Sequence, residues 1–229
     1  MIVYQDSQRT VHRLLLNRIK TNCYLVQRGT EALLIDPTDQ AAEILAYLDA
    51  KGLQLRGMLA THGHCDHVAA AAEMVASGRV DHLYLHADEL VELRRAPAYS
   101  LVVFRKKLAL PPTAAYGPEL HALLADWGLA LEHAGGHTLG SSFIYSLDRQ
   151  LLITGDLALQ HQLRITLAND REDLPAFARF LDRVDELFGP DTTLLPGHGE
   201  PTRVGIERAH NPKWAYVRAR TAAAVAVQA

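Results

Sequence analysis

One short segment of this sequence carries an unusual concentration of side chains that bind metal ions. Residues 61–67 place three imidazoles and one carboxylate close together; in order they are Thr61, His62, Gly63, His64, Cys65, Asp66 and His67. A catalytic zinc site takes three protein ligands and keeps one position for water, so these donors exceed the needs of a single ion. The surplus predicts two metal ions. We call His62, His64, Asp66 and His67 the first cluster.

Three isolated donors further along the chain extend this set. They are His137, Asp156 and His198, each beside a glycine and each where a strand is expected to end. With the first cluster they supply five imidazoles and two carboxylates. Such a donor set suits a pair of borderline divalent ions. We therefore expect two divalent metal ions, with zinc favoured and iron or manganese as alternatives.

The order and local sequence of these seven residues resemble the metallo-β-lactamase superfamily, whose pattern is H-x-H-x-D-H followed by a distant His, Asp and His. All seven positions are filled. Residues 21–26, 34–37 and 207–212 are similar to the branch that contains glyoxalase II, or hydroxyacylglutathione hydrolase. The resemblance implies an α/β fold of the αββα four-layer sandwich type, in which two sheets pack face to face with helices outside.

The resemblance also implies a role for each candidate, both as a metal ligand and as a catalytic residue. It implies two ligand sets joined by one bridging carboxylate: His62, His64 and His137 for the first ion, Asp66, His67 and His198 for the second, and Asp156 between them. A shared carboxylate offsets the repulsion between two dications. Water held between two such ions loses its proton near neutral pH and can attack a carbonyl carbon, so no serine or cysteine nucleophile is needed.

This chemistry suits several activated carbonyl compounds. We expect a metal-dependent hydrolase that cleaves thioesters or related activated esters, similar to glyoxalase II. A lactonase that opens cyclic esters with the same hydroxide is one alternative. A persulfide dioxygenase is another, because members of that similar family hold a single iron with the equivalents of His62, His137 and Asp156.

Residues 89–127 combine basic and apolar side chains and are less regular than their neighbours. They are expected either to form a lid over the substrate or to form an amphipathic helix with a solvated basic face. Candidate substrate contacts in this segment are Tyr99, Phe104, Arg105 and Lys106. His161 is a further candidate, because it lies five residues beyond Asp156 in a loop that must pass the site.

Length, charge and composition further restrict the domain organisation and the class of protein. A chain of 229 residues that is 48% hydrophobic can bury the core of one domain, so we expect a single domain over residues 1–229 with a short helical C-terminus. The net charge of −3 gives no overall positive field that would attract nucleic acid. With no export signal and no run near the ~18 apolar residues of a membrane span, we expect a cytoplasmic enzyme without a membrane partner. Its substrate is expected to be a small molecule, with an anionic thioester as one candidate, and the oligomeric state stays open.

The elements that position these donors follow from hydrophobic periodicity. Strands are expected over residues 11–17, 22–28, 32–35, 58–60, 80–86, 129–133, 142–147, 150–155 and 192–195. Helices are expected over residues 40–51, 68–77 and 173–188. Asp39 is expected to cap the first helix, and Gly52 is expected to end it. The first cluster then lies in a strand-to-helix loop, where α/β sheets commonly place ligands.

Overall fold

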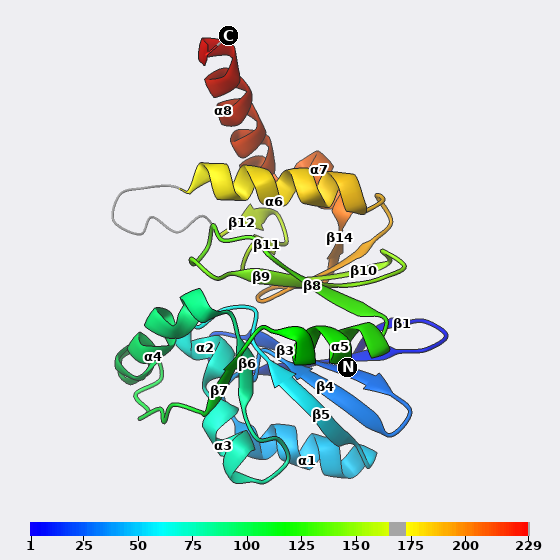
Figure 1. Ribbon diagram of the computed structural model, residues 1–229, viewed down its shortest axis with the longest axis vertical. Coiled ribbons are helices and arrows are strands. Elements are labelled where there is room, and N and C mark those ends of the chain that lie inside the picture. Colours follow the sequence, from blue (N-terminus) through cyan, green and yellow to red (C-terminus); the bar gives the residue numbers. More distant parts are fainter. Residues whose placement is uncertain (165–172, 229) are drawn as a thin grey trace. The chain divides into compact units, whose positions relative to one another are not determined.

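The computed structural model describes residues 1–164 and 173–228 (Figure 1). The chain divides into two compact units, Met1–Leu123 and Leu124–Ala229. Each unit contains a β-sheet together with helices, so the predicted α/β class is confirmed. Among the described helices, none has the length and apolar character that crossing a membrane requires.

The first unit contains a seven-stranded sheet in the order β1-β2-β3-β4-β5-β6-β7. Its strands are β1 (Ile2–Gln5), β2 (Thr10–Leu16), β3 (Thr21–Arg28), β4 (Glu31–Ile35), β5 (Gln54–Leu59), β6 (Leu83–Leu85) and β7 (Thr113–Ala115). Strands β1 to β4 pair antiparallel, whereas β4 to β7 pair in parallel. Parallel neighbours need crossover connections, and helices supply them here.

The helices of this unit lie in those connections, apart from the last one, which follows β7. They are α1 (Ala41–Lys51), α2 (Cys65–Val68), α3 (Ala71–Ala76), the 3-10 helix η1 (Ala87–Glu89), α4 (Leu90–Val103) and α5 (Pro118–Asp126), of which α5 runs past the boundary of the unit. Helices α1 and α3 lie side by side on one face of the sheet (Figure 1). From α1, Ile44 and Leu48 enter the same buried cluster as Leu25 and Leu34 of the sheet.

The C-terminal end of α1 agrees with the sequence prediction, and the N-terminal end differs from it. Gly52 ends the helix in the left-handed conformation, with φ 62°, as predicted. The prediction that Asp39 caps the start is wrong, because the cap is Gln40, with φ 67° and no side-chain cap bond. The Asp39 carboxylate is engaged elsewhere, since its Oδ1 accepts a hydrogen bond from Lys106 Nζ at 2.7 Å.

The helix predicted over residues 68–77 is also different, because it begins earlier and is divided into α2 and α3. The Ala70 N–H donates to the carbonyl oxygen of Pro37 at 3.1 Å instead of to a carbonyl of its own helix. This bond to the segment after β4 interrupts the helical ladder at the point where the two helices separate.

The second unit contains a five-stranded sheet in the order β14-β13-β10-β9-β8, and β11 and β12 form a separate hairpin. Its strands are β8 (Leu129–His133), β9 (Ser142–Ser146), β10 (Leu151–Gly155), β11 (Ala158–Leu159), β12 (Gln162–Leu163), β13 (Thr193–Pro196) and β14 (Thr202–Arg203). Its helices are α6 (Leu174–Leu187), α7 (Val204–His210) and α8 (Pro212–Gln228).

Helix α6 lies along this sheet and covers its core (Figure 1). Phe177, Phe180, Leu181 and Val184 recur at helical spacing and are all buried. The Asp173 side chain caps the helix by accepting the Ala176 N–H at 3.1 Å. The helix predicted over residues 173–188 is therefore confirmed.

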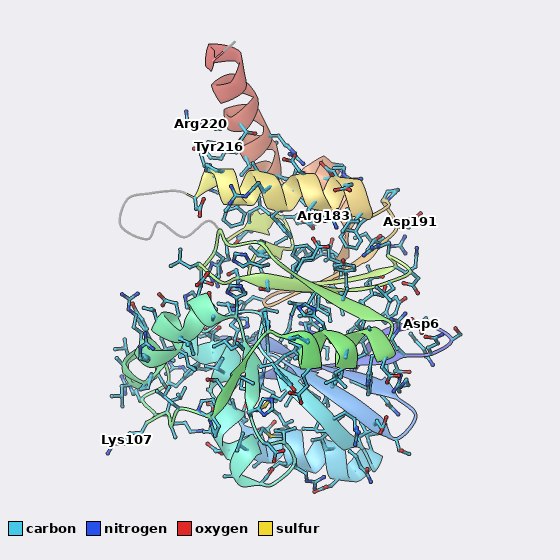
Figure 2. All side chains as sticks on the ribbon, viewed as in Figure 1. Asp6, Lys107, Arg183, Asp191, Tyr216 and Arg220 are labelled. Atoms are coloured by element: carbon cyan, nitrogen blue, oxygen red, sulfur yellow. The ribbon has the colours of Figure 1, made fainter. Side chains whose placement is uncertain are left out.

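An ion pair also fastens α6 to the sheet. Arg183, labelled in Figure 2, donates from Nε and Nη2 to the two carboxylate oxygens of Glu132 in β8, at 2.7 and 2.9 Å. Tyr145 of β9 donates to the same carboxylate at 2.7 Å. The pKa of Glu132 is lower than its ordinary value, and the hydrogen bonds from Arg183 are the main cause.

Candidate metal centre

His62 and His64 lie in the loop between β5 and α2, as the sequence predicts. Asp66 and His67 lie in α2 itself, because that helix begins earlier than predicted. The Nε2 atom of His62 lies 3.1 Å from Nδ1 of His64. The Nε2 atom of His67 lies 3.4 Å from Oδ2 of Asp66. The rings of His62 and His67 are 4.1 Å apart between centroids, and neither side chain has exposed area. The first unit thus brings together all four donors that the sequence places in it.

Asp36, directly after β4, orients two of these rings, and we had not predicted it as a site residue. Its side chain is fully buried, and its Oδ2 lies 3.0 Å from Nδ1 of His67. It also accepts the N–H and the hydroxyl of Thr61, at 2.7 and 2.9 Å. The Thr61 hydroxyl in turn lies 3.1 Å from Nδ1 of His62. Contacts at Nδ1 select Nε2 as the candidate ligand atom of each ring.

Two further elements hold the loop and its carboxylate. Thr21 of β3 donates its hydroxyl to Oδ2 of Asp66 at 3.0 Å. Glu89 of η1 accepts the Gly63 N–H on Oε2 at 2.6 Å. A Cβ atom on Gly63 would lie 3.0 Å from the Glu89 carbonyl oxygen and 3.0 Å from the Leu93 nitrogen. Glycine is therefore required here for the close approach of η1 and α4.

The second unit brings its own three donors together around one carboxylate oxygen. Asp156 follows β10 and His198 follows β13, and these strands are parallel neighbours. Since the ends of such strands meet at the same edge of a sheet, the two side chains are adjacent. Asp156 Oδ2 lies 3.7 Å from Nε2 of His137 and 3.6 Å from Nε2 of His198.

His137 reaches this position through a turn that only glycine permits. Gly136 has φ 92°, and a Cβ atom on it would lie 3.1 Å from the ring of Phe177 in α6. The Nδ1 atom of His137 lies 3.0 Å from the carbonyl oxygen of Arg164. This contact again selects Nε2, which faces Asp156, as the candidate ligand atom.

Arg164 is a second residue of the site that we had not predicted. Its Nε lies 3.4 Å from Oδ2 of Asp156, while its side chain is 48% exposed. The guanidinium therefore places a solvent-accessible positive charge beside the carboxylate that was predicted to bridge the ions. In the sequence, the one feature that indicated Arg164 as a site residue was its position in the loop after Asp156.

The candidate substrate contacts of the first unit differ in their surroundings. Lys106 donates to Asp39 at 2.7 Å and to Glu73 at 3.2 Å. The pKa of Lys106 is raised, and the hydrogen bond to Asp39 is the main cause. Phe104 packs against the buried core of this unit. Tyr99 and Arg105 are exposed. Contact of these residues with a substrate stays a prediction.

His161 lies at the turn between β11 and β12 in the second unit. Its backbone has φ 59°, and its N–H donates to Oε2 of the buried Glu207 at 2.7 Å. The side chain is 51% exposed. A left-handed conformation is uncommon for residues other than glycine, and the bond to Glu207 stabilises the turn that presents this ring. A role in substrate binding stays a prediction here as well.

Comparison with known proteins gives consistent matches over most of the chain. The family model described as Metallo-beta-lactamase superfamily matches residues 16–224. Probable metallo-hydrolase YqgX of Bacillus subtilis is 28% identical over 87% of this chain and 95% of that protein. Hydroxyacylglutathione hydrolase GloC of Haemophilus influenzae is 25% identical over 83% of this chain and 91% of that protein. The crystal structure of TTHA1623 in a di-iron-bound form is 29% identical, with a TM-score of 0.77 over 88% of this chain and 99% of that chain.

Proposed function

This chain belongs to the metallo-β-lactamase superfamily, and on that premise we propose that it is a dinuclear metal-dependent hydrolase of thioesters or related activated esters. The superfamily binds divalent metal ions, typically two. The observation that carries the proposal is that each unit gathers its own predicted donors into one group.

The spacing of the donors fits metal ions. Two ligands of one tetrahedral zinc, each ~2.0–2.1 Å from the ion, lie roughly 3.3 Å apart. The nitrogens of His62 and His64 are 3.1 Å apart, and the donor atoms of Asp66 and His67 are 3.4 Å apart. One oxygen of Asp156 faces histidine nitrogens at 3.6 and 3.7 Å, as a bridging carboxylate would.

We assign the ligands as the family pattern implies. The first ion is held by His62, His64 and His137. The second ion is held by Asp66, His67 and His198. Both ions are held by Asp156. Bound metal ions supply an ionised water at neutral pH and a Lewis acid for the carbonyl oxygen of the substrate. Imidazole and carboxylate ligands support zinc, while the similarity to a protein with a di-iron-bound structure keeps iron as the alternative.

The residues around the ligands prepare them for this chemistry. Asp36 holds Nδ1 of His67, and the Arg164 carbonyl holds Nδ1 of His137, so that each ring presents Nε2 to a metal. The Arg164 guanidinium beside Asp156 is placed to attract an anionic part of the substrate. The similarity to a hydroxyacylglutathione hydrolase supports an acylated thiol as the substrate class. We therefore propose a small anionic thioester.

A combined metal and substrate assay tests the proposal. Elemental analysis of purified protein should give two ions per chain, and the loaded protein should release thiol from thioesters of glutathione or coenzyme A. Lactones serve as the comparison substrates, and faster lactone opening would favour the lactonase. One iron per chain with oxygen uptake on a persulfide would instead indicate the dioxygenase. Failure to bind metal would refute the proposal.

The single domain, the lid over residues 89–127 and the cytoplasmic location stay predictions.

A further inference from the structure

Glu89 is a buried carboxylate that contacts the backbone of the loop carrying His62 and His64. Its side chain has 0% exposed area. Its Oε2 accepts the N–H of Gly63 at 2.6 Å, and Gly63 is the residue between the two histidines. Removing a carboxylate from water is unfavourable unless hydrogen bonds compensate for it. Its burial against this loop therefore requires an explanation beyond packing.

The contact between Glu89 and Gly63 is closely fitted. A Cβ on Gly63 would lie 3.2 Å from the Glu89 carboxylate oxygen, in addition to the two backbone atoms at 3.0 Å. The start of α4 and the carboxylate thus enclose the backbone of Gly63 together. A bond between a carboxylate and a backbone N–H is short and stronger than a neutral one. The loop is therefore held at its midpoint.

We propose that Glu89 is a positioning residue that sets the separation of the ligand nitrogens of His62 and His64. This inference rests on the metal site of the proposed function. The nitrogens of the two rings lie 3.1 Å apart, which is close to the separation that one ion requires. Without the bond to Gly63, the loop relaxes and the two rings lose this spacing, so the first ion binds more weakly.

Three variants separate the geometry of the hydrogen bond from the charge. Glu89→Gln keeps an acceptor oxygen without the negative charge, whereas Glu89→Ala removes the acceptor. Glu89→Asp keeps the charge but withdraws the acceptor by one methylene. Glu132→Ala is the matched control, because it removes a carboxylate bonded to Arg183 and Tyr145, neither of which is a proposed ligand.

The measurement is a stepwise zinc titration against a chromophoric chelator, together with thermal unfolding of the metal-free proteins. Glu89→Ala should weaken one of the two binding steps by about 10-fold or more, as loss of an outer partner of a ligand does in other metal sites. Glu89→Gln should bind zinc as the parent protein does. Glu132→Ala should lower the unfolding temperature and leave both binding steps unchanged. If Glu89→Ala does not fold, Glu89→Asp replaces it, with the same weakened step expected.

Two results would overturn the inference while the proposed function stands. In the first, the parent protein binds two ions and Glu89→Ala, or Glu89→Asp in its place, binds them equally well. In the second, Glu89→Gln is as weak as Glu89→Ala, which would assign the effect to charge. A parent protein that binds no zinc would instead refute the proposed function itself.

Discussion

At the scale of single residues, Asp36 has the largest consequence outside the ligands themselves. It contacts His67 directly and reaches His62 through Thr61, so one carboxylate orients two proposed ligands. Both of its oxygens accept hydrogen bonds in a fully buried position. An amide in its place would keep the shape but would present only one acceptor oxygen.

We therefore expect Asp36→Asn to reduce zinc affinity by about 10-fold or more. Competition with a chelator measures this change. Asp49→Asn, in α1 and paired with Arg79 at the surface, is the control and should bind zinc normally. Unchanged affinity in Asp36→Asn would show that the second oxygen has no role in orienting the rings.

Arg164 gives a separate prediction about the substrate. Arg164→Ala removes the guanidinium but keeps the carbonyl oxygen that contacts His137. The value of kcat/KM should fall about tenfold for an anionic thioester, which corresponds to ~1.4 kcal/mol, and should change little for a neutral one. Arg164→Lys, which keeps the charge, should retain part of the preference. An equal loss on both substrates would contradict this role.

The seven proposed ligands could be predicted because their spacing along the chain is itself the signal. Asp36 and Glu89 could not, because they act on residues far away in sequence, 31 positions for His67 and 26 for Gly63. Such contacts depend on how β4 and η1 are placed beside the loop. No local pattern encodes them.

At the scale of elements, α6 is held against its sheet by the apolar side chains of one buried face. Phe180 is 2% exposed within that face, whereas Arg179 beside it is exposed. Phe180→Ala should lower the free energy of unfolding by ~3–5 kcal/mol because it leaves a cavity. Arg179→Ala should change it by no more than about 0.5 kcal/mol. Urea unfolding of both variants measures the difference, and equal stabilities would contradict the packing described.

The ion pair between α6 and β8 predicts a dependence on pH. The pKa of Glu132 is lowered in the folded protein, chiefly by hydrogen bonds from Arg183, from an ordinary value of 4.5. Its contribution to stability is therefore present above that value and is lost as the pH falls through the lower folded pKa. In the metal-free protein, Glu132→Gln should be less stable than the parent at pH 7, and the difference should shrink near pH 3. A difference independent of pH would refute this assignment.

The longer elements could be predicted from periodicity, and the shortest could not. The expected strands correspond to β2 to β6, β8 to β10 and β13. Five strands were missed, namely β1, β7, β11, β12 and β14. They contain only two to four residues each, which is too short for an alternating pattern to stand out. The equally short β6 and β13 could be predicted because their residues are mostly apolar and buried, whereas β1 and β7 have no buried residue.

At the scale of the whole molecule, the metallo-β-lactamase fold predicted from the resemblance is confirmed. The family model covers residues 16–224, and the similar di-iron-bound structure aligns over 88% of this chain. The pattern of seven donors carried that prediction, because hydrophobic periodicity by itself indicates only the α/β class.

Metal removal should have a global effect on stability. An ion that binds the folded chain and not the unfolded chain stabilises it by ~2.7 kcal/mol at a concentration of 100 times Kd. A chelator should therefore lower the midpoint of thermal unfolding, and added zinc should restore it. His67→Ala should show a smaller response than the parent. Equal midpoints with and without chelator would contradict metal binding by the folded protein.

The parallel pairing of β10 and β13 has a consequence for how such an enzyme diversifies. Asp156 and His198 directly follow paired backbone segments, so their starting points are fixed by the sheet. The connections beyond them can exchange side chains without displacing either one, as long as the Arg164 carbonyl that contacts His137 is kept in place. Mutations there can retune selectivity over generations while the reactive machinery is inherited intact.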